Sequence, residues 1–214
     1  MISCRESIED DSSITASDKE VISHQTENLT VFKIKNQTLS NELVNFFNSS
    51  VSLKSMGVSL GIKDMNYLNF DFKNISKTKI KGIEGDIFVI NYKSNSGSED
   101  NFSFVVFRNI NNDFINPMLI KSVQGKSIEY GLINTGQILS VENSDKIVSL
   151  SITTAYSNKN AKISDCGNAV MSCVQDAYSG HGWASVYIFL QTAFIPETAA
   201  GIVYYCGLKN CNWR

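Results

Sequence analysis

Apolar and polar residues alternate along the middle of the chain, from residue 67 to residue 154. Alternation places every second side chain on the same face of an extended strand, so this pattern predicts half-buried strands separated by polar turns. Consecutive short strands of this kind are typical of an antiparallel meander. The segments that we expect to form strands are 67–72, 87–92, 102–107, 118–123, 127–133, 137–141 and 146–153.

A helix is predicted ahead of these strands. Ser40 is a suitable N-cap residue, and residues 29–34 could form a short strand or lead into the helix. We therefore expect residues 28–155 to form an α+β domain, an antiparallel β-meander covered by one N-terminal helix of about three turns. The apolar residues that recur at helical spacing after Ser40 are Leu43, Val44, Phe46, Phe47 and Val51.

The first part of the chain has a different composition. Residues 6–27 are acidic, rich in Ser and Thr and nearly free of large apolar side chains. Such a segment buries too little apolar surface to offset the conformational entropy lost on ordering. We therefore predict that residues 1–27 form a flexible tether.

The last part of the chain is strongly apolar and is predicted to form helices. A helix capped by Ser164 or Asp165 is expected, and after a second apolar segment at 183–190 a third helix is expected with Pro196 in its first turn. Glu197 would lie favourably near the positive end of that helix dipole. The residues that form an apolar stripe on the first or third helix are Cys166, Ala169, Val170, Cys173, Val174, Ala177, Ala199, Ile202, Val203 and Cys206.

Four of the five cysteines lie in this C-terminal segment, and Cys4 stands alone near the start. No Cys-x-x-Cys pair occurs, and His24 and His181 are the only histidines, so the spacing does not indicate a zinc site. Clustered cysteines without metal-ligand spacing indicate disulfides and an oxidising compartment. We expect residues 163–214 to form a small helical module stapled by disulfides, with residues 156–162 as the linker.

Helix geometry narrows the pairing of these cysteines. Cys166 and Cys173 would lie ~10 Å apart along one helix, which is beyond disulfide reach. The remaining choices are Cys166–Cys211 together with Cys173–Cys206, or the crossed arrangement. We favour the first because Cys173 and Cys206 are each central to an apolar stripe. Each bridge would stabilise the module by ~2–4 kcal/mol.

Charge and motifs give little support to catalysis or nucleic-acid binding. The chain has 19 basic and 21 acidic residues, so it lacks the basic excess of nucleic-acid-binding proteins. Residues 57–61 match the Gly-x-Ser-x-Gly pattern around Ser59, but no strand–turn–helix context or nearby histidine supports a nucleophile elbow. The loop at 94–100 lacks the ligand spacing of a calcium site. We expect no enzymatic activity, no cofactor and no metal.

The extreme N-terminus resembles the end of a bacterial lipoprotein signal. An apolar residue, a spacer and a small residue precede Cys4, and acidic residues follow it. The resemblance covers under a dozen residues, and the hydrophobic part of such a signal is missing. It implies an exported protein that is lipidated at Cys4 and displayed on the bacterial surface.

The C-terminal segment is apolar enough to interact with a membrane. Between residues 183 and 208 only Glu197 is charged, and ~26 residues would span ~39 Å as one helix. The Pro196-Glu197 pair is a poor feature for a single transmembrane helix. Two short apolar helices that open against a membrane would fit the sequence better, and a helical subdomain buried in the protein core is the alternative.

The arrangement of a β-rich leader and a terminal apolar peptide with paired cysteines resembles precursors of secreted bacteriocins, such as the halocin-like group. The resemblance implies a toxin that proteolysis releases, with Lys159 or Lys162 as cutting points, and a leader that keeps it soluble. Its partners would be a target-cell membrane or surface receptor and an immunity protein. The surface expected to insert into the membrane comprises Trp183, Tyr187, Phe189, Leu190, Phe194 and Ile195.

A second hypothesis comes from a different class of protein. The chain could be a non-catalytic surface lipoprotein in which the β-domain and the stapled helices together form one binding module. In that case the C-terminal helices would be structural and would not be released. The two hypotheses differ in whether residues 163–214 act on membranes.

Overall fold

A computed structural model of the chain describes residues 19–25, 28–93, 100–123, 126–144, 147–155, 166–179 and 195–211. The described residues form one antiparallel sheet of nine strands, in which each strand pairs with its neighbours in sequence. Its strands are β1 (Lys19–Gln25), β2 (Leu29–Lys35), β3 (Ile75–Ile80), β4 (Asp86–Asn91), β5 (Asp100–Arg108), β6 (Phe114–Val123), β7 (Ser127–Leu132), β8 (Gln137–Ser144) and β9 (Ile147–Thr154). The predicted α+β class and antiparallel meander are confirmed.

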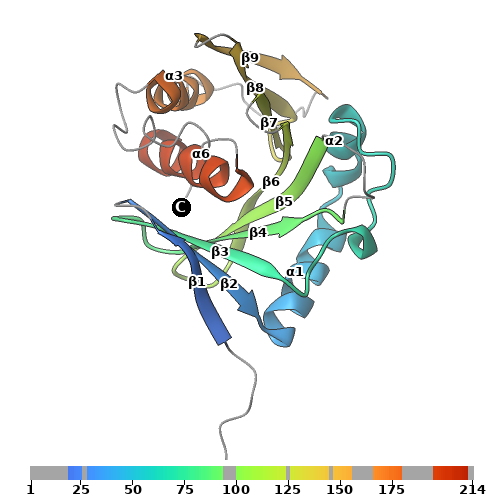
Figure 1. The fold of residues 1–214 in the computed structure, drawn as a ribbon. Helices are drawn as coiled ribbons and strands as arrows, with labels where there is room; N and C mark the ends of the chain where they lie inside the picture. The colour runs from blue at the N-terminus through green and yellow to red at the C-terminus, as the bar shows by residue number, and fades with distance from the viewer. Residues whose placement is uncertain are drawn as a thin grey trace, which may run out of the picture.

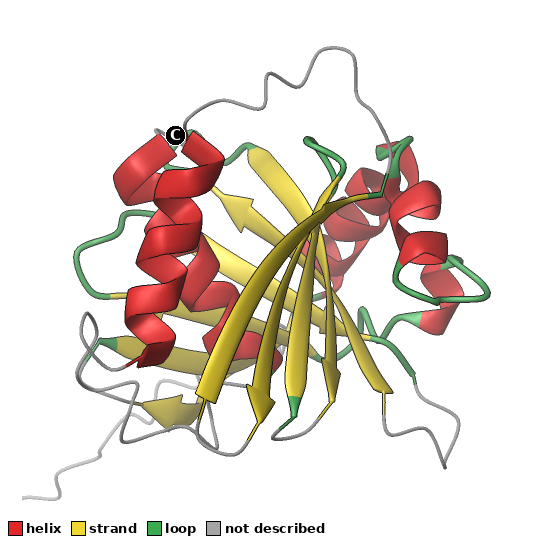
Figure 2. Ribbon diagram, turned by 90° about the horizontal axis from the view of Figure 1, so that it is seen from above, coloured by secondary structure: helices red, strands yellow, loops and turns green. Residues whose placement is uncertain are grey.

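Helices cover both faces of this sheet (Figure 1). One face carries α1 (Gln37–Ser49), α2 (Leu53–Ser59) and the short 3₁₀ helix η1 (Tyr67–Asn69), and the other carries α3 (Cys166–Ser179) and α6 (Pro196–Cys211). The strands fan out with a pronounced twist, so that the sheet curves between the two pairs of helices (Figure 2). The result is a three-layer arrangement with an apolar core on each side of the sheet.

The core beneath α1 is rich in phenylalanine. Phe47 of α1 points into it, and its ring centroid lies 5.1 Å from that of Phe70, 5.8 Å from Phe72 and 5.0 Å from Phe104. Tilted and edge-to-face pairs of this kind add to the stabilisation that comes from burial alone. Of the apolar residues expected at helical spacing after Ser40, Leu43 and Phe47 are buried in this core, whereas Val51 lies beyond the end of α1 and is 92% exposed.

The N-terminal region differs from the prediction in its helices. The helix starts one turn earlier than expected, because Asn36 is the N-cap and its side chain accepts a 2.7 Å hydrogen bond from the Leu39 amide. Ser40 lies inside the helix, where its hydroxyl donates to the carbonyls of Asn36 and Phe72. A second helix, α2, follows, so the expectation of a single N-terminal helix is wrong.

Three strand assignments also differ from the prediction. The tether was expected to extend to residue 27, but residues 19–25 form β1, which pairs with β2. The alternating segment 67–72 is not a strand: it forms η1, and Phe70 makes only an isolated bridge to Tyr92. Strand β3, which was not predicted, lies between β2 and β4.

Candidate functional site

Helix α6 lies across the sheet with apolar side chains on nearly all of its faces. It packs against strands β2 to β6 on one side and against α3 on another. Proline in its first turn, Glu197 near its N-terminus and Lys209 in its last turn all favour a helix here. The α6 side chains that are fully buried are Ala199, Ala200, Ile202, Val203 and Tyr204, each 0% exposed.

The α6 backbone approaches the sheet closely at Gly201. A Cβ atom at this position would lie 2.7 Å from Cδ1 of Leu29, which is buried on β2. Glycine therefore permits the contact between this turn of the helix and β2. The small residues before it, Ala199 and Ala200, allow the same approach along the first half of α6.

A polar cluster joins the first turn of α6 to the sheet. The Glu197 carboxylate accepts a hydrogen bond from Ser76 Oγ at 2.7 Å and pairs with Lys33 Nζ at 3.2 Å. Lys33 and Ser76 are partners across β2 and β3, and Lys33 Nζ donates to Ser76 Oγ at 2.5 Å. The Glu197 side chain is only 10% exposed, whereas Lys33 is 49% exposed. This carboxylate is largely buried, and its Oε1 atom has both a hydroxyl donor and a lysine cation as partners, as a buried charge requires.

A second polar contact fixes the middle of α6. The Tyr204 hydroxyl donates to the backbone carbonyl of Asn116 in β6. Asn116 has a positive φ of 50° beside a β-bulge, where the register between β5 and β6 shifts. Asn134 donates to its side-chain oxygen at 3.3 Å. The bulge therefore turns one carbonyl of the sheet toward the helix.

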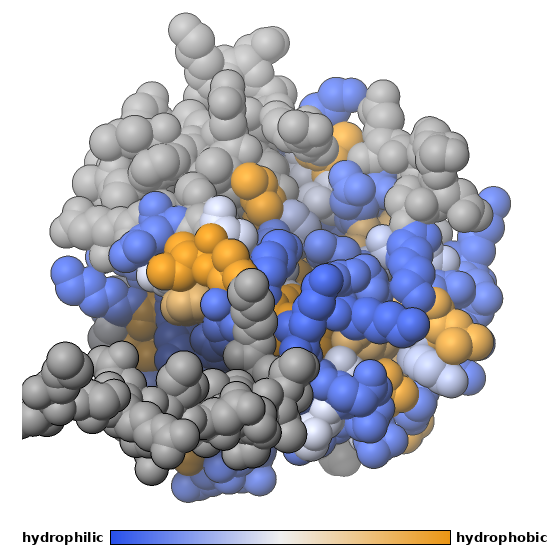
Figure 3. Space-filling model, turned by 60° about the horizontal axis from the view of Figure 1, so that its bottom comes forward, coloured by the Kyte–Doolittle hydropathy of each residue, from blue (hydrophilic) through white to orange (hydrophobic). Residues whose placement is uncertain are grey.

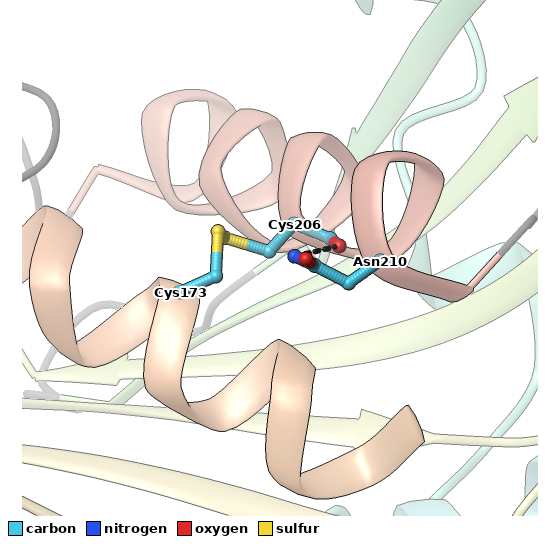
Figure 4. Close-up of a disulfide and its surroundings, with 3 residues drawn as sticks. All are labelled: Cys173, Cys206 and Asn210. Atoms are coloured by element: carbon cyan, nitrogen blue, oxygen red, sulfur yellow. Dashed lines mark hydrogen bonds between the residues drawn. A yellow bond between two sulfur atoms is a disulfide. The ribbon is translucent and has the colours of Figure 1, made fainter. Parts of the chain in front are cut away.

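A disulfide bond joins α6 to α3 (Figure 4). Cys173 and Cys206 are 33 residues apart in sequence, with Cα atoms separated by 5.6 Å. The Asn210 side chain donates to the Cys206 carbonyl at 2.9 Å one turn further along. The favoured pairing of these two cysteines is thus present. Cys211 is also disulfide-bonded, and the side chain of Cys166, its predicted partner, lies outside the described residues.

Two buried tyrosines connect α3 to the sheet. The hydroxyls of Tyr130 in β7 and Tyr178 in α3 lie 2.6 Å apart and are fully buried. Burial raises the pKa of Tyr130 well above its ordinary value, and the neighbouring Tyr178 phenol raises it further. Burial also raises the pKa of Tyr178 and of Tyr204. All three phenols are therefore neutral hydrogen-bonding groups at neutral pH.

The outer side of the helix pair is hollowed. A hollow of about 360 Å³ lies between α3 and α6, where the Cys173–Cys206 disulfide forms part of its wall. Tyr205 and Lys209 line it from α6, and both also line a second hollow between that helix and the β3–β4 and β5–β6 turns. Seen from below, the described surface is mainly hydrophilic, and its apolar side chains gather in separate patches (Figure 3).

Most residues predicted to act on membranes lie outside the described part of the chain. Of the expected inserting side chains, Ile195 is described and is 42% exposed just before α6. The others, together with the cleavage and lipidation positions and one of the two histidines, lie outside the described residues: Trp183, Tyr187, Phe189, Leu190, Phe194, Lys159, Lys162, Cys4 and His181. Within the described residues, no helix has the length and apolar character needed to cross a bilayer.

The remaining sequence motifs occupy ordinary structural positions. Ser59 is the last residue of α2, and its hydroxyl donates to the Ser55 carbonyl at 3.0 Å. A nucleophile elbow needs a strand before the serine, whereas a helix precedes it here. Asp100, from the loop considered for calcium, pairs with Lys121 Nζ at 3.4 Å. No cluster of His, Cys, Asp or Glu suited to a metal ion occurs among the described residues.

The polar residues of the sheet that contact α6 were not predicted from the sequence. Glu197 was noted as the one charge in a long apolar stretch, and that isolation was a signal that a partner should exist. Lys33 and Ser76 could not be assigned because β3 was not recognised as a strand. Tyr204 and Asn116 gave no sequence signal, since their contact depends on a bulge.

Comparison of the chain with protein-family models, curated proteins and solved structures finds no match.

Proposed function

We propose that the chain is an exported precursor of a bacteriocin-like peptide, residues 163–214, that acts on target-cell membranes. Residues 28–155 hold the peptide's apolar helix against the sheet, and cleavage at Lys159 or Lys162 frees it. Lipid on Cys4 would keep the precursor at the cell surface. A target membrane or receptor and an immunity protein would be its partners.

The position of the Cys173–Cys206 disulfide carries this proposal. The bond links two helices that both belong to residues 163–214, and residues 28–155 contain no cysteine. The contacts described between α6 and the sheet are hydrogen bonds, one ion pair and apolar packing. Cleavage in the linker would therefore leave this cross-link inside the peptide, as release of a stapled toxin requires.

The burial of α6 supports a masking role for the sheet. A helix that is apolar on nearly every face is a liability in water, because exposed apolar patches promote association. In this chain the sheet covers one side of α6 and α3 covers another. The same apolar faces would become available to a bilayer once the helix pair leaves the sheet.

A non-catalytic surface binding module is the second candidate. The deep burial of α6 favours this candidate, since five side chains of the helix are 0% exposed. A helix buried this deeply also suits a permanent core element. In that case α3 and α6 would stay on the sheet after cleavage of the linker.

Dye leakage from liposomes separates the two candidates. The full chain would be made with a specific protease site in 156–162, and leakage would be recorded before and after cleavage, with the disulfides intact or reduced. The proposal predicts no leakage from the intact chain and leakage from the cleaved, oxidised protein. A variant with an uncleavable linker is the matched control. Absence of leakage after complete cleavage would contradict the precursor proposal and favour the binding module.

A further inference from the structure

The second hollow beside α6 has the size and lining of a small-molecule site. It measures about 710 Å³, within the range of ~300–1,000 Å³ common for ligand pockets. Its walls come from three places that are distant in sequence: the β3–β4 turn, the β5–β6 turn and the C-terminal half of α6. Neither the membrane-active precursor nor the surface binding module gives this hollow a role.

Part of the lining of this hollow is apolar. Ile83, Phe107 and Leu208 all line it, and Phe107 is only 2% exposed. Tyr205 adds an aromatic ring from α6. Ile110 stands at the rim and is 69% exposed, although it belongs to neither core of the protein. An exposed isoleucine at the edge of an apolar hollow would gain buried area if a ligand filled the space.

Two opposite charges line the same space without neutralising each other. Glu84 projects from the β3–β4 turn, and Lys209 belongs to the last turn of α6. Neither makes an ion pair with any described residue, and Lys209 Nζ lies 5.6 Å from the centre of the Tyr205 ring. The nearby charges of Asp86 and Arg108 are already paired at 3.1 Å. Glu84 and Lys209 are therefore available to a ligand.

The β3–β4 and β5–β6 turns that line this hollow are held in shape by local contacts. Gly85 has a φ of +115°, and a Cβ there would lie 2.6 Å from the Arg108 carbonyl, so β4 and β5 approach closely beside the hollow. The Asn109 side-chain oxygen accepts hydrogen bonds from the amides of Asn111 at 3.0 Å and Asp113 at 2.9 Å. A pre-shaped site loses less entropy when it binds a ligand.

We propose that this hollow binds a small zwitterion with an apolar body. Its ammonium group pairs with Glu84, its carboxylate or phosphate pairs with Lys209, and its apolar part packs on Ile83, Phe107 and Leu208. The amide groups of Asn109 and Asn111 complete the polar rim. Free apolar amino acids and phospholipid ethanolamine head groups both have this chemistry. The inference stands independently of the precursor proposal, because it concerns the folded, uncleaved chain.

Calorimetric titration of the full chain with L-phenylalanine tests the charge pattern. Saturable binding is expected, and Glu84→Gln and Lys209→Met should each raise Kd about tenfold or more, because each removes a charge-assisted contact. The matched controls are Glu42→Gln and Lys54→Met, two exposed residues on the α1–α2 side, which should leave Kd unchanged. N-acetyl-L-phenylalanine, which lacks the ammonium group, should bind the native chain and the Glu84→Gln variant equally weakly.

Vesicle sedimentation distinguishes the two sources of the zwitterion. Binding to vesicles containing phosphatidylethanolamine, but not to vesicles of phosphatidylglycerol alone, with loss in both variants, would assign the site to a lipid head group. Binding of the amino acid alone would assign it to a free metabolite. Failure of both probes, or binding that survives both charge substitutions in variants with native thermal unfolding, would overturn the proposal.

Discussion

Tyr130, Tyr178 and Tyr204 place three hydroxyl groups inside the core on the α6 side of the sheet. A buried hydroxyl is tolerated when it has a hydrogen-bond partner. Tyr130 and Tyr178 satisfy each other, and Tyr204 donates to Asn116. Each phenol therefore depends on a contact between a C-terminal helix and the sheet.

These tyrosines predict a loss of stability at alkaline pH. Their pKa values are raised in the folded chain, so their contribution is complete below the unfolded value of about 10 and is lost as pH rises toward the folded values. The free energy of unfolding should then fall by up to ~1.4 kcal/mol per pH unit for each tyrosine. Urea unfolding between pH 8 and pH 11 measures it. An equally steep fall in a Tyr130→Phe/Tyr178→Phe variant would disprove this cause.

Glu197 and Lys33 predict a modest coupling between α6 and the sheet. Their ion pair is half-exposed on the lysine side, so we expect a coupling free energy of about 1 kcal/mol. A double-mutant cycle with Glu197→Gln and Lys33→Met, followed by chemical unfolding, measures it. Glu42→Gln on the exposed face of α1 is the control. Strict additivity of the two substitutions would show that the pair does not hold the helix.

Among the helices and strands, sequence patterns located those whose side chains separate clearly into buried and exposed faces. Strands β4 to β9 and helices α3 and α6 lie close to their predicted positions. Strand β1 was missed because Val21 and Ile22 are about half exposed and its pairing relies on the backbone. Strand β3 was missed because its buried residues include Ser76, Lys77 and Thr78, which read as surface positions.

Of the contacts that α6 makes, the disulfide could be predicted from the sequence and the polar contacts with the sheet could not. Helix spacing excluded a bond between Cys166 and Cys173, and the central positions of Cys173 and Cys206 on their apolar stripes favoured the bond that is present. The polar contacts could not be predicted, because they depend on which strand lies beneath each turn of α6. Only the register of Lys33 against Ser76 brings both side chains to Glu197.

Gly201 is expected to control how closely α6 can approach β2. Gly201→Val would crowd Leu29 and should lower the free energy of unfolding by ~2 kcal/mol. Leu29→Ala should relieve part of this crowding, so the double variant should lose less than the two single losses combined. Ser55→Val on the exposed side of α2 controls for the cost of a β-branched residue in a helix. Full additivity would place the strain elsewhere.

The sheet as a whole is built to be covered on both faces. Truncation after residue 155 would remove α3 and α6 and expose apolar side chains of β3 to β8. We expect the truncated chain to bind a hydrophobic dye strongly and to aggregate, whereas removal of residues 1–18 should have neither effect. Dye fluorescence and light scattering measure both. A soluble, dye-free truncated chain would show that the sheet does not need these helices.

Release of the C-terminal peptide requires that its helices are cross-linked to each other and attached to the sheet by noncovalent contacts alone. Mass spectrometry of the linker-cleaved protein, unfolded without reductant, tests this directly. The predicted result is two separate chains, with the disulfides retained in the C-terminal one. A single covalent species that separates only after reduction would contradict the account, because a disulfide would then join the peptide to the rest of the chain.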